Sequence, residues 1–181
     1  MSQSYDQKIL IASPKTSGMF RHTVVYIHTN DETGAAGAIL NVRMEQSMAE
    51  SWAEEMGWQY PENIHLGGPV ERQLGYVIHT NDYAHYTSIP LNEYFSFTGG
   101  RAIISDINRG TGPYQFTLNV GYCGWQPGQL EDEVVRGDWI VADFDPDIFF
   151  QNLDREAYWE FAVHVAAQQR TEKLLDTFDT V

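Results

Sequence analysis

GYCGWQPGQLEDE, residues 121–133, holds three glycines, a tryptophan, a proline and the only cysteine of the chain. Glycine permits backbone angles and close approaches that a Cβ atom forbids. Pro127 suits the first turn of a helix, the acidic residues 131–133 suit its beginning, and Gly137 suits its end. The stretch therefore predicts a glycine-rich corner followed by a short helix within 127–136.

The segments on either side of this stretch read as strands. Residues 114–120 alternate apolar and polar side chains after a Gly-Pro turn signal, which is typical of a strand with one buried face. Residues 139–142 form a short apolar run. Further strands are predicted by similar runs at 9–12, 24–27, 35–42, 64–66, 76–79, 86–89 and 95–98.

Three more helices are expected. Residues 47–56 begin with a capping box, Ser47 with Glu50, and place Met48, Trp52 and Met56 on one face. Residues 101–108 are ambiguous, but three isoleucines at helical spacing favour a helix. A last helix is predicted to start at Asp154 and to bury a face that includes Tyr158.

Several motifs in order resemble the AlgH/YqgE family, a bacterial family of unestablished biochemical activity. The stretches that carry the resemblance are ILIASP at 9–14, MFR at 19–21, GAAG at 34–37 with Leu40 and Asn41, LGGPV at 66–70, GYVIH at 75–79, and GYCGWQPGQLEDEV at 121–134 with Asp138 and Trp139. The matches run from about residue 9 to Trp159. The chain departs from the family pattern at Asn30, Val42 and Cys123, where histidine, a basic residue and alanine are usual.

The resemblance implies an α+β fold. It implies a single domain with a branched, mainly antiparallel sheet that partly closes into a small barrel and is flanked by helices. We expect one domain over residues 1–181, with a core at about 9–168 and a tail at 169–181. Some members of the family are labelled transcriptional regulators, but the resemblance supplies no mechanism.

The charge of the chain disfavours direct binding to nucleic acid. The formal net charge is −14, and residues 127–181 carry 13 acidic and 4 basic side chains. The basic residues of the rest of the chain are scattered singly, whereas a nucleic-acid site normally needs a basic patch. A single cysteine cannot form an intramolecular disulfide, and no stretch reads as a secretory signal or a membrane span. We expect a cytoplasmic protein.

Candidate chemistry is outweighed by simpler structural explanations. Cys123 could be a nucleophile near a helix start, but a small buried residue is the favoured reading. The six histidines are His22, His28, His65, His79, His85 and His164, and they show no spacing typical of zinc. The acidic residues at 131–133 and at 143, 145 and 147 are better explained by helix capping and turns than by acid/base or calcium chemistry. We expect no metal and no cofactor.

If a pocket exists, we expect the two glycine corners to build it. This hypothesis combines backbone donors with aromatic, amide and guanidinium groups, which suits a small ligand or a peptide. The predicted binding residues are Arg21, Asn41, Gly67, Gly68, Pro69, Gly121, Gly124, Trp125 and Gln129.

The first hypothesis for function is a non-enzymatic, cytosolic module that binds a ligand or a protein partner. Any role in transcription would then be indirect. One alternative is a thiol-dependent or hydrolytic enzyme that uses Cys123. The other is a regulator that binds DNA directly, which the net charge of −14 disfavours.

Overall fold

The computed structural model describes residues 3–179, and the described chain divides into two compact units. Unit 1 comprises residues 3–37 and 124–179, and unit 2 comprises residues 38–123. The chain passes between the units within two strands, β3 (Gly34–Ile39) and β8 (Phe116–Trp125).

The strands of unit 1 are arranged around β1 (Ile9–Ala12). This strand pairs antiparallel with β2 (Val24–Asp31) on one side and with β9 (Trp139–Ala142) on the other, so that Leu10 faces both Val25 and Val141. All four residues of β1 are buried, as are residues 24–27 of β2. Continuous apolar runs are typical of strands covered on both faces, and the expectation for these two segments is confirmed.

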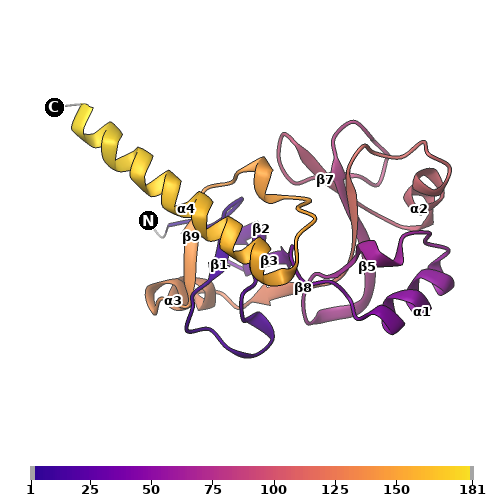
Figure 1. The fold of residues 1–181 in the computed structure, drawn as a ribbon, viewed down its shortest axis with the longest axis horizontal. Coiled ribbons are helices and arrows are strands. Elements are labelled where there is room, and N and C mark those ends of the chain that lie inside the picture. The colour runs from indigo at the N-terminus through magenta and orange to yellow at the C-terminus, as the bar shows by residue number, and fades with distance from the viewer. Residues whose placement is uncertain (1–2, 180–181) are drawn as a thin grey trace. The chain divides into compact units, whose positions relative to one another are not determined.

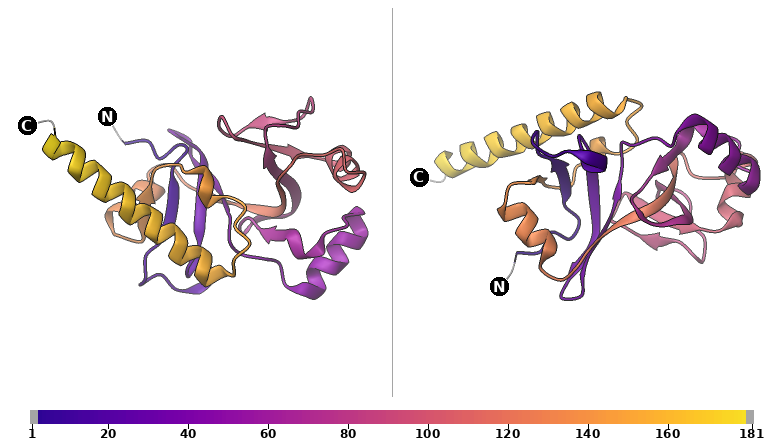
Figure 2. Two further views of the ribbon diagram at one scale, coloured as in Figure 1. Left: turned by 45° about the horizontal axis from the view of Figure 1, so that its top comes forward. Right: turned by 90° about the horizontal axis from the view of Figure 1, so that it is seen from below.

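Two α-helices belong to unit 1. They are α3 (Gln129–Val135) and α4 (Arg155–Asp179), with the short 3-10 helices η1 (Gly18–Phe20) and η3 (Pro146–Ile148). The buried face of α4, which includes Tyr158 and Ala162, packs on β1, β2 and β9. The helix then continues past these strands (Figures 1 and 2), and residues 170–179 are exposed. The expected tail is therefore helical as far as Asp179.

The sheet of unit 2 is branched. Its strands are β4 (Ile64–Leu66), β5 (Val70–Thr80), β6 (Ile89–Pro90), β7 (Phe95–Gly99) and most of β8. The order β6-β7-β5-β8 is antiparallel, and β4 lies off this path because it pairs parallel with β8. The short η2 (Pro61–Asn63) leads into β4.

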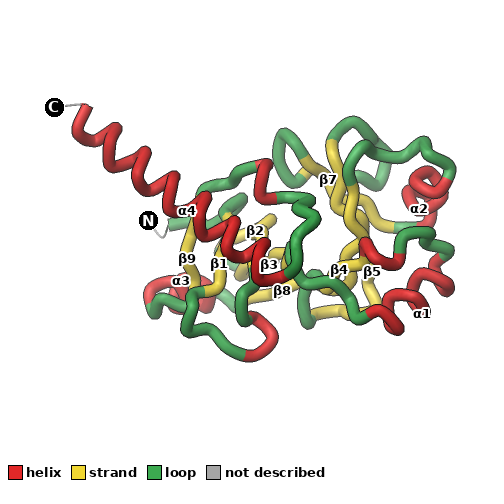
Figure 3. Tube along the Cα trace, in the orientation of Figure 1, coloured by secondary structure: helices red, strands yellow, loops and turns green. Residues whose placement is uncertain are grey.

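The helices of unit 2 are α1 (Gln46–Met56) and α2 (Arg101–Asn108), drawn in red in Figure 3. The α2 prediction is confirmed, because its three isoleucines are buried. The predicted capping box of α1 is wrong: Glu45 caps this helix, since its carboxylate accepts bonds from the Ser47 and Met48 amides. The predicted stripe is also wrong at Met48, which is 59% exposed, while the small residues Ala49 and Ala53 are buried.

The predicted corner at residues 121–124 is an uninterrupted strand. β8 runs from Phe116 to Trp125, and Gly121 lies inside it with φ +74°. Glycine tolerates this angle, so the strand bends without ending. The register between β5 and β8 shifts between Val70 and Gly75, near the same point. The helix that follows begins at Gln129, after a left-handed Gly128, rather than at Pro127.

The fold class is confirmed as α+β, with a branched and mainly antiparallel sheet that curls as a half-barrel and is flanked by helices. That the whole chain forms a single domain stays a prediction. Among residues 3–179, no helix has the length and apolar character needed to cross a membrane.

Candidate functional site

The two glycine corners predicted to form a pocket do meet, and at three of their glycines the backbones approach each other too closely for a Cβ atom. A Cβ atom on Gly68 would lie 2.1 Å from the backbone carbon of Tyr122, and one on Gly121 would lie 2.4 Å from the Gly68 oxygen. A Cβ atom on Gly67 would lie 2.2 Å from the Gly121 oxygen. The amide of Gly67 donates to Val120 at 2.8 Å. We call Gly67, Gly68 and Gly121 the glycine contact. Its glycines serve close packing of backbone against backbone.

Cys123 lies beside the glycine contact and is buried, with 2% of its surface exposed. Its thiol donates a weak hydrogen bond to the Gly67 oxygen at 3.5 Å. Burial raises the pKa of the Cys123 thiol to about 12. The thiol is therefore protonated at neutral pH, whereas a nucleophilic cysteine reacts as the thiolate. This geometry argues against the alternative of a thiol-dependent enzyme.

We call residues 121–133 the signature stretch. Its second half forms a hydrogen-bonded group in unit 1. The carboxylate of Glu133 accepts bonds from the indole Nε1 atoms of Trp125 at 2.9 Å and Trp139 at 2.8 Å, both at Oε2. Its Oε1 accepts a bond from Gln129 Nε2 at 2.9 Å. We call these four residues the Glu133 cluster. It ties α3 to the end of β8 and to the start of β9.

Helix geometry and a ring contact bring the four residues of the Glu133 cluster together. Gln129 and Glu133 are four residues apart on α3 and so share one face of the helix. The rings of Trp125 and Trp139 meet edge to face, with centroids 6.4 Å apart. Hydrogen bonds to a charged acceptor are stronger than neutral ones. Two buried indole rings, each of a residue that is only 7% exposed, therefore share one carboxylate in unit 1.

A recess of about 430 Å³ opens next to this cluster. We call it the Trp139 recess. Its lining consists of Lys15, Thr16, Ser17, Phe20, Glu133, Arg136, Asp138 and Trp139. Phe20 and Trp139 meet edge to face, with ring centroids 5.9 Å apart, and provide the aromatic part of the wall. Its size falls in the range of small-molecule sites, which is about 300 to 1,000 Å³.

The charged groups of the Trp139 recess hold one another in place. Arg136 Nε donates to Asp138 Oδ2 at 2.8 Å, and this contact is the main cause of a lowered pKa for the Asp138 carboxyl. Lys15 Nζ donates to the backbone oxygen of Arg136 at 2.9 Å, and Thr16 Oγ1 donates to that of Asp138 at 3.1 Å. The recess thus combines aromatic rings, two cations, two anions and hydroxyl groups.

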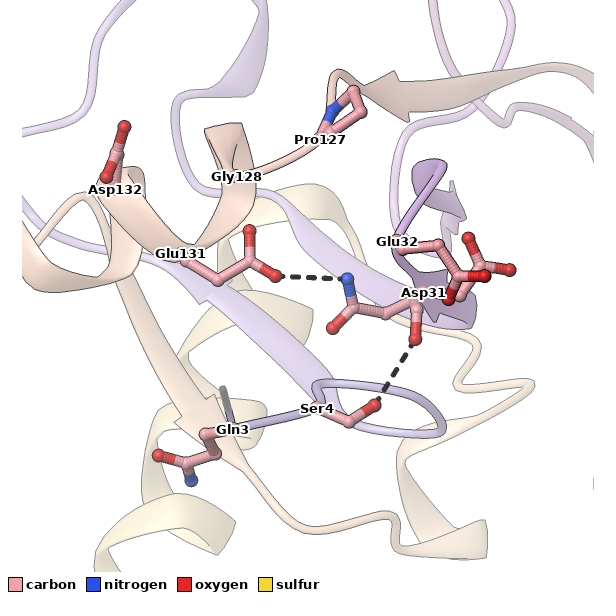
Figure 4. A pocket seen from close by; sticks show the side chains of 9 residues that line it. Gln3, Ser4, Asp31, Glu32, Pro127, Gly128, Glu131 and Asp132 are labelled. Carbon is pink, nitrogen blue, oxygen red and sulfur yellow. Dashed lines mark hydrogen bonds between the residues drawn. The ribbon is translucent and has the colours of Figure 1, made fainter. Parts of the chain in front are cut away.

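A second recess, of about 500 Å³, lies on the part of unit 1 where α3 begins (Figure 4). Its ionisable lining is entirely acidic, and the full lining is Gln3, Ser4, Asn30, Asp31, Glu32, Pro127, Gly128, Glu131 and Asp132. Asn30 Nδ2 donates to Glu131 Oε1 at 3.3 Å, and the Ser4 hydroxyl donates to the Asn30 backbone oxygen at 3.4 Å. These bonds fasten the N-terminal segment and the end of β2 to α3.

The remaining predicted site residues lie in different surroundings. Asn41 is buried in unit 2, with 4% of its surface exposed. Pro69 is exposed after Gly68, and Gly124 is exposed in β8. Arg21 directly follows η1 in unit 1. Its side chain lines a recess together with the first residues of α4 and does not line the Trp139 recess. Of the predicted set, the structure brings together the glycine contact in unit 2 and the pair Trp125 and Gln129 in unit 1.

The histidines do not gather into a metal site. Within residues 3–179, no group of three or more histidine, cysteine, aspartate or glutamate side chains is placed to hold a metal ion. His79 is fully buried, with Nδ1 2.9 Å from the Thr80 oxygen and Nε2 2.7 Å from Thr98 Oγ1. Because a carbonyl only accepts, Nδ1 carries the proton and Nε2 accepts from the Thr98 hydroxyl. This histidine belongs to the hydrogen-bonded interior of unit 2.

Reasoning from the sequence missed Glu133 and Trp139 as partners of Trp125. The available signal was the spacing of Gln129 and Glu133, which places both on one helix face. The pairing of that face with two tryptophans from neighbouring strands depends on the tertiary fold.

Comparison with known proteins agrees with this structure. The sequence pattern of the family DUF179, described as AlgH-like, matches residues 9–170. A UPF0301 protein of Methylococcus capsulatus is 34% identical over 161 residues, which cover 86% of this chain and 88% of the relative. A UPF0301 protein of Ruegeria pomeroyi is 36% identical over 166 residues, with the same two coverages.

Two solved structures are similar. The solution structure of the AlgH protein from Pseudomonas aeruginosa has a TM-score of 0.71 at 28% identity and covers 90% of this chain and 92% of its own. The crystal structure of protein DIP2367 from Corynebacterium diphtheriae has a TM-score of 0.63 at 19% identity, over 87% and 92% of the two chains, and shows a likeness of fold alone. The match over most of the chain confirms the resemblance seen in the sequence motifs: the chain belongs to the AlgH-like family DUF179.

Proposed function

We propose that this protein is a non-enzymatic binding module and that the Trp139 recess holds its ligand, a small molecule or a short segment of a partner protein. The observation that carries the proposal is the recess itself: about 430 Å³, with two aromatic rings in its wall and charged groups of both signs around them. Ligand sites typically combine an apolar wall with a few fixed polar groups.

The chemistry of the recess favours a ligand with a flat apolar body and a polar end. The partly exposed ring of Phe20, packed against the buried ring of Trp139, forms the apolar wall for the body. Lys15 and Arg136 are exposed at the rim, with 60% and 62% of their side chains accessible, and can reach an anionic end. Because the hydrogen bonds of Glu133 already fix Trp139, little ordering is needed on binding.

Two further features of the chain shape this proposal. We place the binding event in the cytoplasm, because the only cysteine is buried as a free thiol and needs no oxidising compartment. We further propose that any effect on transcription is indirect. A net charge of −14 opposes the approach of a phosphate backbone.

The test is a variant that fills the recess. Ser17 is exposed and lines the recess, so Ser17→Trp should fill part of it while leaving the Glu133 cluster intact. The matched control is Ser51→Trp, which places the same side chain on an exposed position of α1 in unit 2. Both variants and the wild type are purified from the native host, and native mass spectrometry records any bound small molecule or partner chain.

The expected result is a bound species of defined mass on the wild type and on Ser51→Trp, reduced at least tenfold on Ser17→Trp. In the wild type, the indole N–H signal of Trp139 should move when the isolated species is added back in a titration followed by nuclear magnetic resonance. Equal occupancy in all three proteins would reject this recess as the site, and a bare wild-type chain would reject the proposed function.

A further inference from the structure

A third recess of unit 1 lies where α4 begins, apart from the Glu133 cluster. Its volume is about 480 Å³, and we call it the Arg21 pocket. It is lined by Gly18, Arg21, His22, Asp154, Arg155 and Glu156. The first three residues belong to the loop around η1, and the last three form the start of the long helix α4.

The loop and the helix are held together by a guanidinium group. Arg155 Nη2 donates to the backbone oxygen of Met19 at 2.7 Å and to that of Arg21 at 2.5 Å. The ring of His22 stacks on Trp159, with centroids 4.3 Å apart and planes 23° from parallel. The backbone of His22 has φ +52°, a left-handed conformation that is uncommon for residues other than glycine.

The two arginines place like charges beside each other. Burial lowers the pKa of Arg155, and the positive charge of Arg21 lowers it further. The guanidinium of Arg21 has no hydrogen bond or ion pair to any of residues 3–179, and its residue is exposed. Its five N–H donors are therefore open to a ligand.

The two acidic residues of the pocket both have partners, Asp154 in the first turn of α4 and Glu156 at the pocket wall. Asp154 Oδ1 accepts the backbone amide of Ala157 at 2.9 Å, as a helix cap does. Glu156 Oε2 lies 3.6 Å from Nδ1 of His22, and 60% of the Glu156 side chain is exposed. The first turn of α4 adds a favourable potential for a negative charge.

We propose that the Arg21 pocket binds an oxyanion, a phosphate or a carboxylate group, with Arg21 as the residue that contacts it directly. Guanidinium groups suit both groups, because their parallel N–H bonds match two oxygens of either. Arg155 contributes mainly its charge, since it is occupied in holding the loop. The anion reduces the repulsion between the two guanidinium groups. This site does not depend on the Trp139 recess, so either proposal can fail alone.

The test is a titration of the full chain with inorganic phosphate and, separately, with succinate, at constant ionic strength set with chloride. The ring signals of Trp159 and His22 report binding in nuclear magnetic resonance spectra. We expect a saturable shift with at least one of the two anions. Saturation by phosphate alone identifies a phosphate site, and saturation by succinate alone identifies a carboxylate site.

Three variants make the test specific. Arg21→Gln should weaken binding at least tenfold, and Arg21→Lys should weaken it less, because the charge remains but the paired donors are lost. The matched control Arg72→Gln removes the same charge from an exposed position in unit 2 and should leave binding within twofold. No saturable shift with either anion, or equal weakening by Arg21→Gln and Arg72→Gln, would overturn the proposal. Arg21 is exposed, so unfolding midpoints should confirm that its variants are folded.

Discussion

The signature stretch has two halves, and they are built in opposite ways. Gly121 in unit 2 packs backbone against backbone with Gly67 and Gly68 at the glycine contact, where a Cβ atom does not fit. Trp125, Gln129 and Glu133 in unit 1 interact through side chains, and a recess opens beside them. The glycines of this stretch thus allow close backbone packing, whereas its tryptophan takes part in side-chain hydrogen bonds. The first half packs backbone against backbone, and the second half lies beside the recess that we propose as the binding site.

The largest effect should come from adding one methyl group at the glycine contact. Gly68→Ala places a Cβ atom 2.1 Å from the Tyr122 backbone at φ +156°. Neither backbone can yield cheaply, so we expect a loss of about 4 kcal/mol in the free energy of unfolding. Urea unfolding measures it. The control is Gly128→Ala, which has φ +80° but no atom within 4 Å of the new methyl group and should cost about 1 kcal/mol. Similar losses of unfolding free energy in the two variants would show that close backbone packing does not distinguish the first half of the stretch from the second.

A slightly smaller loss in the free energy of unfolding is expected when the pH is lowered. Burial, and then the charge of Arg43, lower the pKa of His65 to about 4 from an ordinary value of 6.5. Below pH 6.5 the unfolded chain binds a proton that the folded protein excludes, so stability falls as the pH drops from 6.5 to about 4. The total contribution is about 3 kcal/mol.

The measurement is urea unfolding of the wild type and of His65→Leu at pH 7 and pH 4.5. His65 lies in β4, just before the glycine contact, and its Nδ1 atom is buried without a hydrogen bond to the described residues. The leucine variant should lose less stability on acidification than the wild type, by about 2 to 3 kcal/mol. Parallel pH profiles in the two proteins would mean that this region admits water and is less tightly packed than the glycine contact.

The smallest effect should come from the second half of the stretch. Glu133→Gln keeps an acceptor oxygen for the indoles but removes its charge, and we expect a loss of about 1 to 2 kcal/mol. The indole N–H signals of Trp125 and Trp139 should move together, since both bonds end on one oxygen. Glu131→Gln on the same helix is the control, because its single side-chain bond to Asn30 is long at 3.3 Å, and it should cost less than about 0.5 kcal/mol. If the two variants behave alike, the Glu133 cluster does not stabilise unit 1.

Local patterns in the sequence predicted those helices and strands whose own residues show a helical or strand pattern. The isoleucines of α2 and the continuous apolar run of β1 identify these elements without reference to the rest of the chain. The motifs also pointed to the α+β class through the family resemblance. The α1 cap was missed because Glu45, which is not a usual capping residue, reaches the first amides of the helix.

The candidate site was predicted only in part, because its geometry depends on segments distant in sequence. Gly67 and Gly121 were rightly grouped, but the sequence cannot show whether two corners enclose a space or close on each other. Trp125 and Gln129 were chosen for their chemical type. That they share Glu133 with Trp139 follows from the pairing of β9 with β1, which places the second indole beside α3.

The division of the chain has a consequence for the order in which the protein is made on the ribosome. Residues 38–123 form unit 2 as one continuous segment, whereas unit 1 draws on both ends of the chain. β1 is synthesised before unit 2, whereas β9, which pairs with it, and α4, which covers it, are synthesised after unit 2. The nascent chain therefore carries an apolar strand with an open edge while all of unit 2 is translated. Open edges of this kind promote misassociation, so β1 and β2 are exposed to it until β9 and α4 have been made.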